Sequence, residues 1–156
     1  MITCKNPILS GFYPDPSICR VGEWFYLVTS TFAYFPGIPV FRSRNLAQWE
    51  QIGNILTRES QLPLQGCEHN EGIYAPTLRW HKGTFYLITT NISGGGNFIV
   101  TAKNPQGPWS ESHFLENARG IDPSLFFDED GTCYYIGQRE NSRGGRYNGD
   151  CEIWIQ

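Results

Sequence analysis

The segment GFYPDPSI, residues 11–18, introduces the pattern that organises the chain. Two prolines flank one carboxylate. Each proline fixes its own φ and restricts the residue before it, so we expect Asp15 to be held in an extended conformation. An apolar strand follows, and after a Gly-Glu turn the chain continues as WFYLVTS, residues 24–30. An aspartate at the mouth of a buried strand either forms a local turn or belongs to a functional site.

The same pattern occurs three times along the chain. DPSI at 15–18 matches APTL at 75–78, and WFYLVTS at 24–30 matches TFYLITT at 84–90, both at an offset of 60 residues. A third copy opens with DPSL at 122–125, at an offset of 47 residues from the second. A repeat of this length, built from short strands, is typical of the blades of a β-propeller.

The runs between Gly, Pro and Asn residues are short and rich in β-branched and aromatic residues, which predicts an all-β fold. TIM-barrel and Rossmann folds need helices between their strands, and helical periodicity is almost absent here. A β-sandwich is the remaining alternative, but it does not predict so regular a repeat. We expect four strands in the first repeat: Ser17–Val21, Trp24–Thr31, Pro39–Ser43 and Trp49–Gly53.

The number of repeats predicts an incomplete propeller. The third repeat contains its first two strands and a further candidate strand at 151–155, so the chain holds two full blades and part of a third. A closed propeller needs four to eight blades. We therefore expect residues 1–156 to be the N-terminal part of a single propeller domain. The exposed edge at 151–156 would allow self-association, because unpaired strand edges pair with other chains.

Composition excludes several functional classes. The net charge is -3 and basic residues are scattered, which argues against nucleic-acid or anionic-membrane binding. No apolar run is long enough to span a membrane, and the first residues lack the apolar core of a signal peptide. Five cysteines without CxxC spacing suggest reduced thiols in a cytoplasmic protein. The three histidines show no metal-ligand spacing, so no metal site is predicted.

The two repeated aspartates are the best candidates for catalytic residues. Ala75 occupies the equivalent position in the second repeat, so we infer that a strand entrance does not need an aspartate in order to fold. The first strand of each propeller blade lines the central axis, so Asp15 and Asp122 should face one cavity. Converging carboxylates suit general acid and base chemistry, because their mutual field separates their pKa values. They also suit a hard cation, which prefers oxygen ligands.

Two aromatic residues beside strand entrances are candidates for substrate binding. Phe32 follows the second strand of the first repeat, and Tyr74 precedes the second repeat. Most aromatic residues serve core or loop packing, and that alternative applies here. The functional interpretation is a wall on which the apolar face of a sugar ring stacks.

Several motifs together resemble glycoside hydrolase family 43, the β-xylosidase and α-L-arabinofuranosidase group. They cover almost the whole chain: Asn6-Pro7 with residues 11–17, STF at 30–32 with FPG at 35–37, GIYAP at 72–76 and GIDPSLF at 120–126. The resemblance implies a five-bladed β-propeller and hydrolysis with inversion by three axial carboxylates.

The resemblance also implies roles for individual residues. Asp15 is similar to the general base that activates water, and Asp122 to the residue that orients the general acid and raises its pKa. Phe32 and Tyr74 are similar to walls of the sugar subsite. The chain departs from the family in carrying Tyr-Ala-Pro-Thr at 74–77 where many members have Trp-Ala-Pro-Asp. The motif of the general-acid glutamate is absent, and neither Glu71 nor Glu152 matches it.

The function implied is inverting hydrolysis of xylosyl or arabinofuranosyl linkages in oligosaccharides from plant polysaccharides. Xylo- or arabino-oligosaccharides would be the ligands. No cofactor is expected, and a structural cation in the channel of a complete propeller stays an alternative. Without the acid, we expect the chain alone to have little or no activity. Two other functions stay open: a non-catalytic carbohydrate-binding propeller fragment, and one half of a split enzyme.

Overall fold

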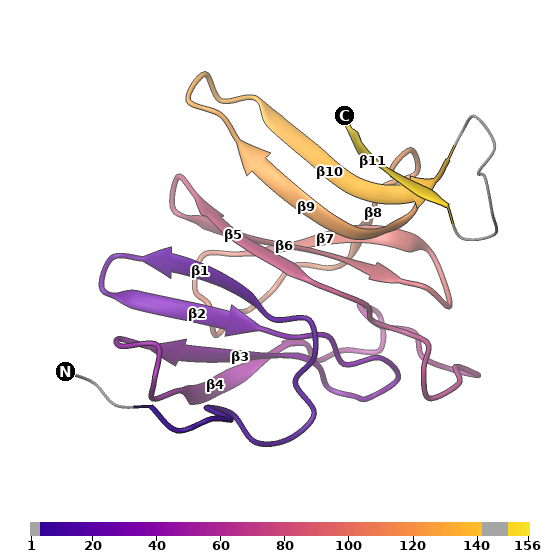
Figure 1. Cartoon of the computed structure of the whole chain (residues 1–156). Helices are drawn as coiled ribbons and strands as arrows, with labels where there is room; N and C mark the ends of the chain where they lie inside the picture. Colours follow the sequence, from indigo (N-terminus) through magenta and orange to yellow (C-terminus); the bar gives the residue numbers. More distant parts are fainter. Residues whose placement is uncertain (1–3, 142–149) are drawn as a thin grey trace.

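The computed structural model describes residues 4–141 and 150–156, and all regular elements in these ranges are β-strands (Figure 1). No helix in the described ranges could cross a membrane. The strands form three antiparallel sheets. The first contains β1 (Ser17–Val21), β2 (Trp24–Val28), β3 (Gly37–Ser43) and β4 (Glu50–Leu56), the second β5 (Thr77–His81), β6 (Thr84–Asn91), β7 (Gly96–Ala102) and β8 (His113–Phe114), and the third β9 (Ile121–Phe127), β10 (Cys133–Glu140) and β11 (Cys151–Ile155).

The predicted fold class is confirmed. Each of the first two sheets is a four-stranded meander, and the third has three strands, in agreement with two blades and part of a third. The sheets are layered so that β1 packs beside β5 and β5 beside β9 (Figure 1). The prediction that all of residues 1–156 belong to one propeller domain stays untested.

Some strand limits differ from the prediction. β2 ends at Val28 rather than Thr31, because the next residues leave the sheet to make other contacts: the Ser30 amide donates to the Pro14 carbonyl at 3.1 Å. β4 is Glu50–Leu56, longer than predicted, and its pairing with β3 shifts between Val40 and Phe41. Such a bulge increases local strand twist, and it occurs beside Gly53, which pairs with Val40.

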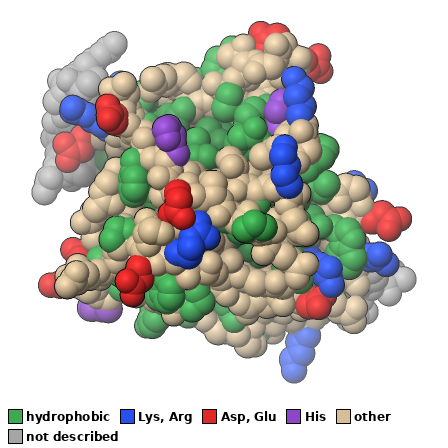
Figure 2. Space-filling view, turned by 180° about the vertical axis from the view of Figure 1, so that it is seen from behind, with side chains coloured by type: hydrophobic (Ala, Val, Ile, Leu, Met, Phe, Trp, Pro, Cys, Tyr) green, Lys and Arg blue, Asp and Glu red, His purple; other side chains and the backbone are tan. Residues whose placement is uncertain are grey.

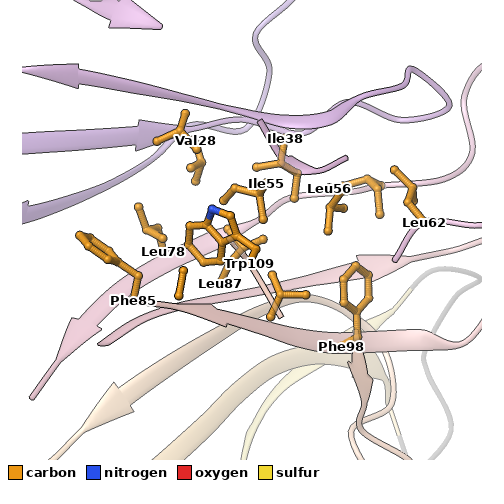
Figure 3. Close-up of a cluster of buried hydrophobic side chains, with 14 residues drawn as sticks. Val28, Ile38, Ile55, Leu56, Leu62, Leu78, Phe85, Leu87, Phe98 and Trp109 are labelled. Carbon is orange, nitrogen blue, oxygen red and sulfur yellow. The ribbon is translucent and has the colours of Figure 1, made fainter. Parts of the chain in front are cut away.

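The main core lies between the first and second sheets. Side chains alternate along a strand, so Leu87 of β6 faces the first sheet while its neighbour Ile88 faces the third. Both faces of β6 are therefore covered, which explains its uninterrupted apolar run from Phe85 to Ile88. Figure 3 shows this main cluster, which includes Val28, Ile38, Ile55, Leu56, Leu62, Leu78, Phe85, Leu87, Phe98 and Trp109.

A buried amide joins the second sheet to the start of the third. Asn97 is 1% exposed, and its Nδ2 lies 2.7 Å from the Ala118 carbonyl oxygen and 3.1 Å from that of Gly120. Asn97 Nδ2 also lies 2.9 Å from the Tyr135 hydroxyl oxygen, which accepts a hydrogen bond from it. Buried polar groups must be hydrogen-bonded, so this arrangement fixes the approach to β9. On the surface, acidic and basic side chains are interspersed on the face shown in Figure 2.

Candidate active site

The entrances to β1, β5 and β9 meet in one cavity of about 430 Å³. Asp15 and Asp122 both line it, and Ala75, the equivalent residue of the second sheet, lies in the same lining. The structure therefore brings together two aspartates that are far apart in sequence. Their arrangement is the one that the repeat predicted, because the first strands of successive blades pack side by side (Figure 1).

The backbone at both aspartates differs from the extended conformation that we predicted for Asp15. Asp15 has φ 53° and Asp122 has φ 55°, in the left-handed region, whereas Ala75 does not have a positive φ. Aspartate tolerates this region better than most residues, because its short polar side chain can hydrogen-bond locally. The flanking prolines thus did not predict the backbone conformation of Asp15. Ala75 is also not a full structural equivalent, so part of the preference for aspartate is conformational.

The Asp15 carboxylate is held by a buried hydroxyl group. Ser30 Oγ donates to Asp15 Oδ2 at 2.6 Å, and Ser30 is fully buried while Asp15 is exposed. The Ser30 amide also donates to the carbonyl of Pro14, the residue before Asp15. Sequence reasoning did not select Ser30, although it lies directly before Thr31 and Phe32 in the STF motif.

The Asp122 carboxyl group is in a different environment. Burial of the carboxyl raises its pKa, and the negative charge of Asp15 raises it further. Protein atoms cover only part of the carboxyl group and Asp122 is an exposed residue, so solvent screens both effects. In the described part of the chain, no hydrogen bond to the Asp122 carboxyl group lowers its pKa again.

Two serines, each two residues after an aspartate, tie the outer sheets to the middle one. Ser17 Oγ accepts a hydrogen bond from the Leu78 amide at 3.1 Å. Ser124 Oγ accepts one from Arg79 Nη2 at 3.0 Å, and Arg79 Nε donates to the Leu125 carbonyl at 3.0 Å. The repeated serine of DPSI and DPSL was the signal that could have found these contacts.

The predicted substrate-binding aromatics lie against each other. The ring centroids of Phe32 and Tyr74 are 5.4 Å apart, and Phe32 exchanges backbone hydrogen bonds with Ile73 at 2.8 and 3.0 Å. Gly72 makes this approach possible, because a side chain there would collide with the Phe32 carbonyl oxygen. The segment containing Tyr74 is therefore fixed to the loop after β2.

Two further rings extend this pair into an aromatic cluster of Phe12, Phe32, Tyr34 and Tyr74. Phe12 lies 5.8 Å from both Phe32 and Tyr34, measured between ring centroids. Phe12 is 59% exposed and Tyr34 63% exposed, so they offer open ring surface, and sequence reasoning selected neither. The cluster adjoins the cavity rather than lining it: Tyr74 directly precedes Ala75 of the cavity lining. The roles of Phe32 and Tyr74 stay predictions.

The remaining acidic candidates lie elsewhere. Glu71 Oε2 accepts a hydrogen bond from the Glu68 amide at 3.1 Å, and Glu152 forms an ion pair with Arg139 at 2.9 Å. Neither glutamate lines the cavity with the two aspartates. Within residues 4–141 and 150–156, no group of three histidine, cysteine or acidic side chains is arranged to hold a metal ion.

Comparison with known proteins identifies relatives of the whole chain. The model of the family described as glycosyl hydrolases family 43 matches residues 4–156. The chain is 65% identical to a xylosidase/arabinosidase of Butyrivibrio fibrisolvens, covering 100% of this chain and 30% of that protein. It is 54% identical to a non-reducing end alpha-L-arabinofuranosidase of Bacteroides ovatus, covering 86% of this chain and 26% of that protein.

Solved structures agree with these matches. A xylan beta-1,4-xylosidase from Bacillus halodurans is 45% identical with a TM-score of 0.84, covering 93% of this chain and 29% of that one. A family 43 subfamily 12 protein from a capybara gut metagenome is 46% identical with a TM-score of 0.87, covering 96% and 29%. The chain thus spans about 30% of the length of the proteins that it matches. The resemblance inferred from the motifs is confirmed, and the chain belongs to glycoside hydrolase family 43.

Proposed function

We propose that this chain supplies two carboxylates to an inverting glycosidase that hydrolyses xylosyl or arabinofuranosyl linkages of plant-polysaccharide oligosaccharides. The observation that carries the proposal is the presence of Asp15 and Asp122 in one cavity of a family 43 chain. The names of its relatives support both sugars, since they include a xylosidase/arabinosidase and an alpha-L-arabinofuranosidase.

Asp15 acts as the general base in this proposal. An inverting glycosidase needs one carboxylate to take a proton from water on one face of the sugar and a protonated acid on the other face. Ser30 donates to Asp15 Oδ2, and we assign the water to Oδ1, the oxygen that this hydrogen bond leaves unused. The carboxylate is also exposed, which allows water and substrate to reach it.

Asp122 acts on the general acid rather than on water. A negative charge close to a second carboxyl group raises the pKa of that group and so keeps it protonated. Neither Glu71 nor Glu152 lines the cavity, and we propose that the acid comes from outside the described residues. The chain alone should then have little or no hydrolytic activity.

The aromatic cluster gives the proposal its sugar-binding element. Phe32 and Tyr74 would form the wall, and the open faces of Phe12 and Tyr34 would extend it. The same exposed rings favour the second candidate function, carbohydrate binding without catalysis. The two functions differ in whether the aspartates are needed for turnover.

A hybrid enzyme tests the proposal. Residues 1–156 would replace the matching segment of the Butyrivibrio fibrisolvens protein, and hydrolysis of nitrophenyl β-xyloside and nitrophenyl α-L-arabinofuranoside would be measured with and without a chelator. We expect hydrolysis of at least one substrate, with inversion, no need for an added cofactor, and loss of activity with Asp15→Ala.

Three outcomes, from the hybrid and from the isolated chain assayed beside it, would count against parts of the proposal. A folded hybrid that binds xylo-oligosaccharide but hydrolyses neither substrate would favour the binding function. Loss of activity with the chelator would support a structural cation. Turnover by the isolated chain, abolished by Asp15→Ala, would contradict an external acid.

We also propose that the chain self-associates through its third sheet. Among the described strands, β11 has β10 as its single neighbour, and Ile153 and Ile155 are 72% and 65% exposed. Unpaired edges favour pairing with another strand. Sedimentation should show association that Ile153→Lys weakens, and a monomer at all concentrations would contradict it.

We also propose a cytoplasmic location for the chain. The five free cysteines support it, and cell fractionation can test it.

A further inference from the structure

We propose that Ser30 is a positioning residue that holds the Asp15 carboxylate in the orientation needed to take a proton from water. This inference rests on the proposed function, in which Asp15 is the general base. It concerns a side chain that lies in the STF motif but was assigned no role from sequence.

The hydrogen bond between Ser30 and Asp15 is short. Ser30 Oγ lies 2.6 Å from Asp15 Oδ2, in the range of charge-assisted O–H···O⁻ bonds, which are about twice as strong as neutral ones. The Pro14 carbonyl oxygen is a second possible acceptor, but it lies 3.5 Å from the same hydroxyl. A hydroxyl group has one proton to donate, so the carboxylate receives it.

Ser30 is itself rigidly placed. It is 0% exposed, so its hydroxyl does not exchange between protein and solvent partners. Its amide donates to the Pro14 carbonyl at 3.1 Å, which ties the chain on the N-terminal side of Asp15 to the end of β2. The backbone bond and the side-chain bond together attach both the main chain and the carboxylate to the same buried residue.

This attachment matters because Asp15 is otherwise free to move. The residue is exposed, and an exposed carboxylate samples several side-chain rotamers. A general base must keep one oxygen within hydrogen-bonding reach of the water that it deprotonates. Fixing Oδ2 leaves Oδ1 in one place, and a misplacement of about 1 Å can cost about a hundredfold in rate.

The equivalent positions elsewhere do not repeat this contact. In the second sheet the matching residue is Thr90, whose hydroxyl donates to Asn97. In the third sheet the described residues place no hydrogen bond on the Asp122 carboxyl group. The contact is thus specific to the aspartate that the proposal makes the base.

The first experiment uses the chain itself. Three-bond Hα–Hβ couplings of Asp15, measured by NMR, report whether its side chain keeps one rotamer. We expect unequal couplings with Ser30, averaged couplings with Ser30→Ala, and unequal couplings again with Ser30→Thr, which keeps the hydroxyl. Ser43→Ala is the matched control, because Ser43 is also buried and bonds to the turn after β3 rather than to Asp15.

The second experiment measures catalysis in the hybrid enzyme. Ser30→Ala should lower kcat about tenfold to a hundredfold with little change in KM, since orientation affects the reaction step more than sugar binding. Ser30→Thr should restore most of kcat, and Ser43→Ala should leave it unchanged. If Ser30→Ala does not fold, Ser30→Cys keeps the volume with a weaker donor and takes its place.

The outcomes separate the two proposals. A single Asp15 rotamer in Ser30→Ala, or an active hybrid whose kcat is unaffected by that change, would overturn the role of Ser30 and leave the proposed function intact. A folded hybrid that is inactive with Ser30 present would overturn the proposed function, and the role in catalysis would fall with it.

Discussion

The starts of β1 and β9 share the sequence Asp-Pro-Ser and a left-handed aspartate, but their carboxyl groups differ. Asp15 receives a hydrogen bond from buried Ser30. Asp122 has a raised pKa because burial and the charge of Asp15 disfavour its ionised form. Residues distant in sequence make the difference, so a shared motif places an aspartate without deciding its chemistry.

The largest expected effect is the loss of catalysis when each aspartate is removed from the hybrid enzyme. Asp15→Ala should lower kcat/KM about a thousandfold or more, because general base catalysis typically contributes about 10² to 10⁴. Asp122→Ala should cost less, about tenfold to a hundredfold, since it acts through the acid. Asp130→Ala, in the exposed β9–β10 hairpin, is the control and should leave kcat/KM unchanged. A larger loss for Asp122→Ala would reverse the assigned roles.

A smaller effect concerns how the β9 entrance is held. Gly120 has φ 95°, and a Cβ there would clash with the Gln138 carbonyl oxygen of β10. Gly120→Ala should lower the free energy of unfolding by about 2 to 4 kcal/mol, combining backbone strain and the clash. Gly131 has nearly the same φ, 94°, but a Cβ there would meet only the end of the flexible Lys82 side chain at 3.8 Å, so Gly131→Ala should cost about 1 kcal/mol. Urea unfolding measures both, and equal losses would contradict the clash.

The smallest effect tests the environment of Asp122 through pH. Its folded-state pKa is raised, so between the ordinary aspartate pKa and the raised value the unfolded chain loses its proton first. Stability therefore falls as pH rises through this window. Asp122→Asn removes that loss, and its free energy of unfolding should exceed that of the wild type more at pH 7 than at pH 3. The gain should stay below about 1 kcal/mol, because solvent screens the exposed carboxyl.

Asp130 is a control of opposite sign in the same sheet. Hydrogen bonds from the backbone and side chain of Thr132 lower its pKa, so its ionised form stabilises the fold above the ordinary aspartate pKa, and this is lost as pH falls. The free energy of unfolding of Asp130→Asn should therefore fall below that of the wild type at pH 7, and the difference should shrink at pH 3. The same pH trend in both variants would show that the Asp122 shift is not the cause.

Prediction from sequence succeeded where a feature depends on local pattern repeated at intervals. The matching positions of Asp15 and Asp122 indicated a common cavity, because equivalent strands of successive blades lie side by side. It was wrong on the Asp15 backbone, since the flanking prolines suggested an extended residue where φ is 53°. Phe12 and Tyr34 were missed because their ring contacts depend on how two loops fold over each other.

The sequence by itself determined the sheets and their repetition, because strand periodicity and turn residues act within a few neighbours. The tertiary structure alone decided which atoms surround each aspartate. Ser30 is 15 residues from Asp15, and Asp15 is far in sequence from the Asp122 whose pKa it raises. Hydrogen bonds and charge interactions depend on distances of a few ångströms, and only the packing of one sheet on the next sets those distances.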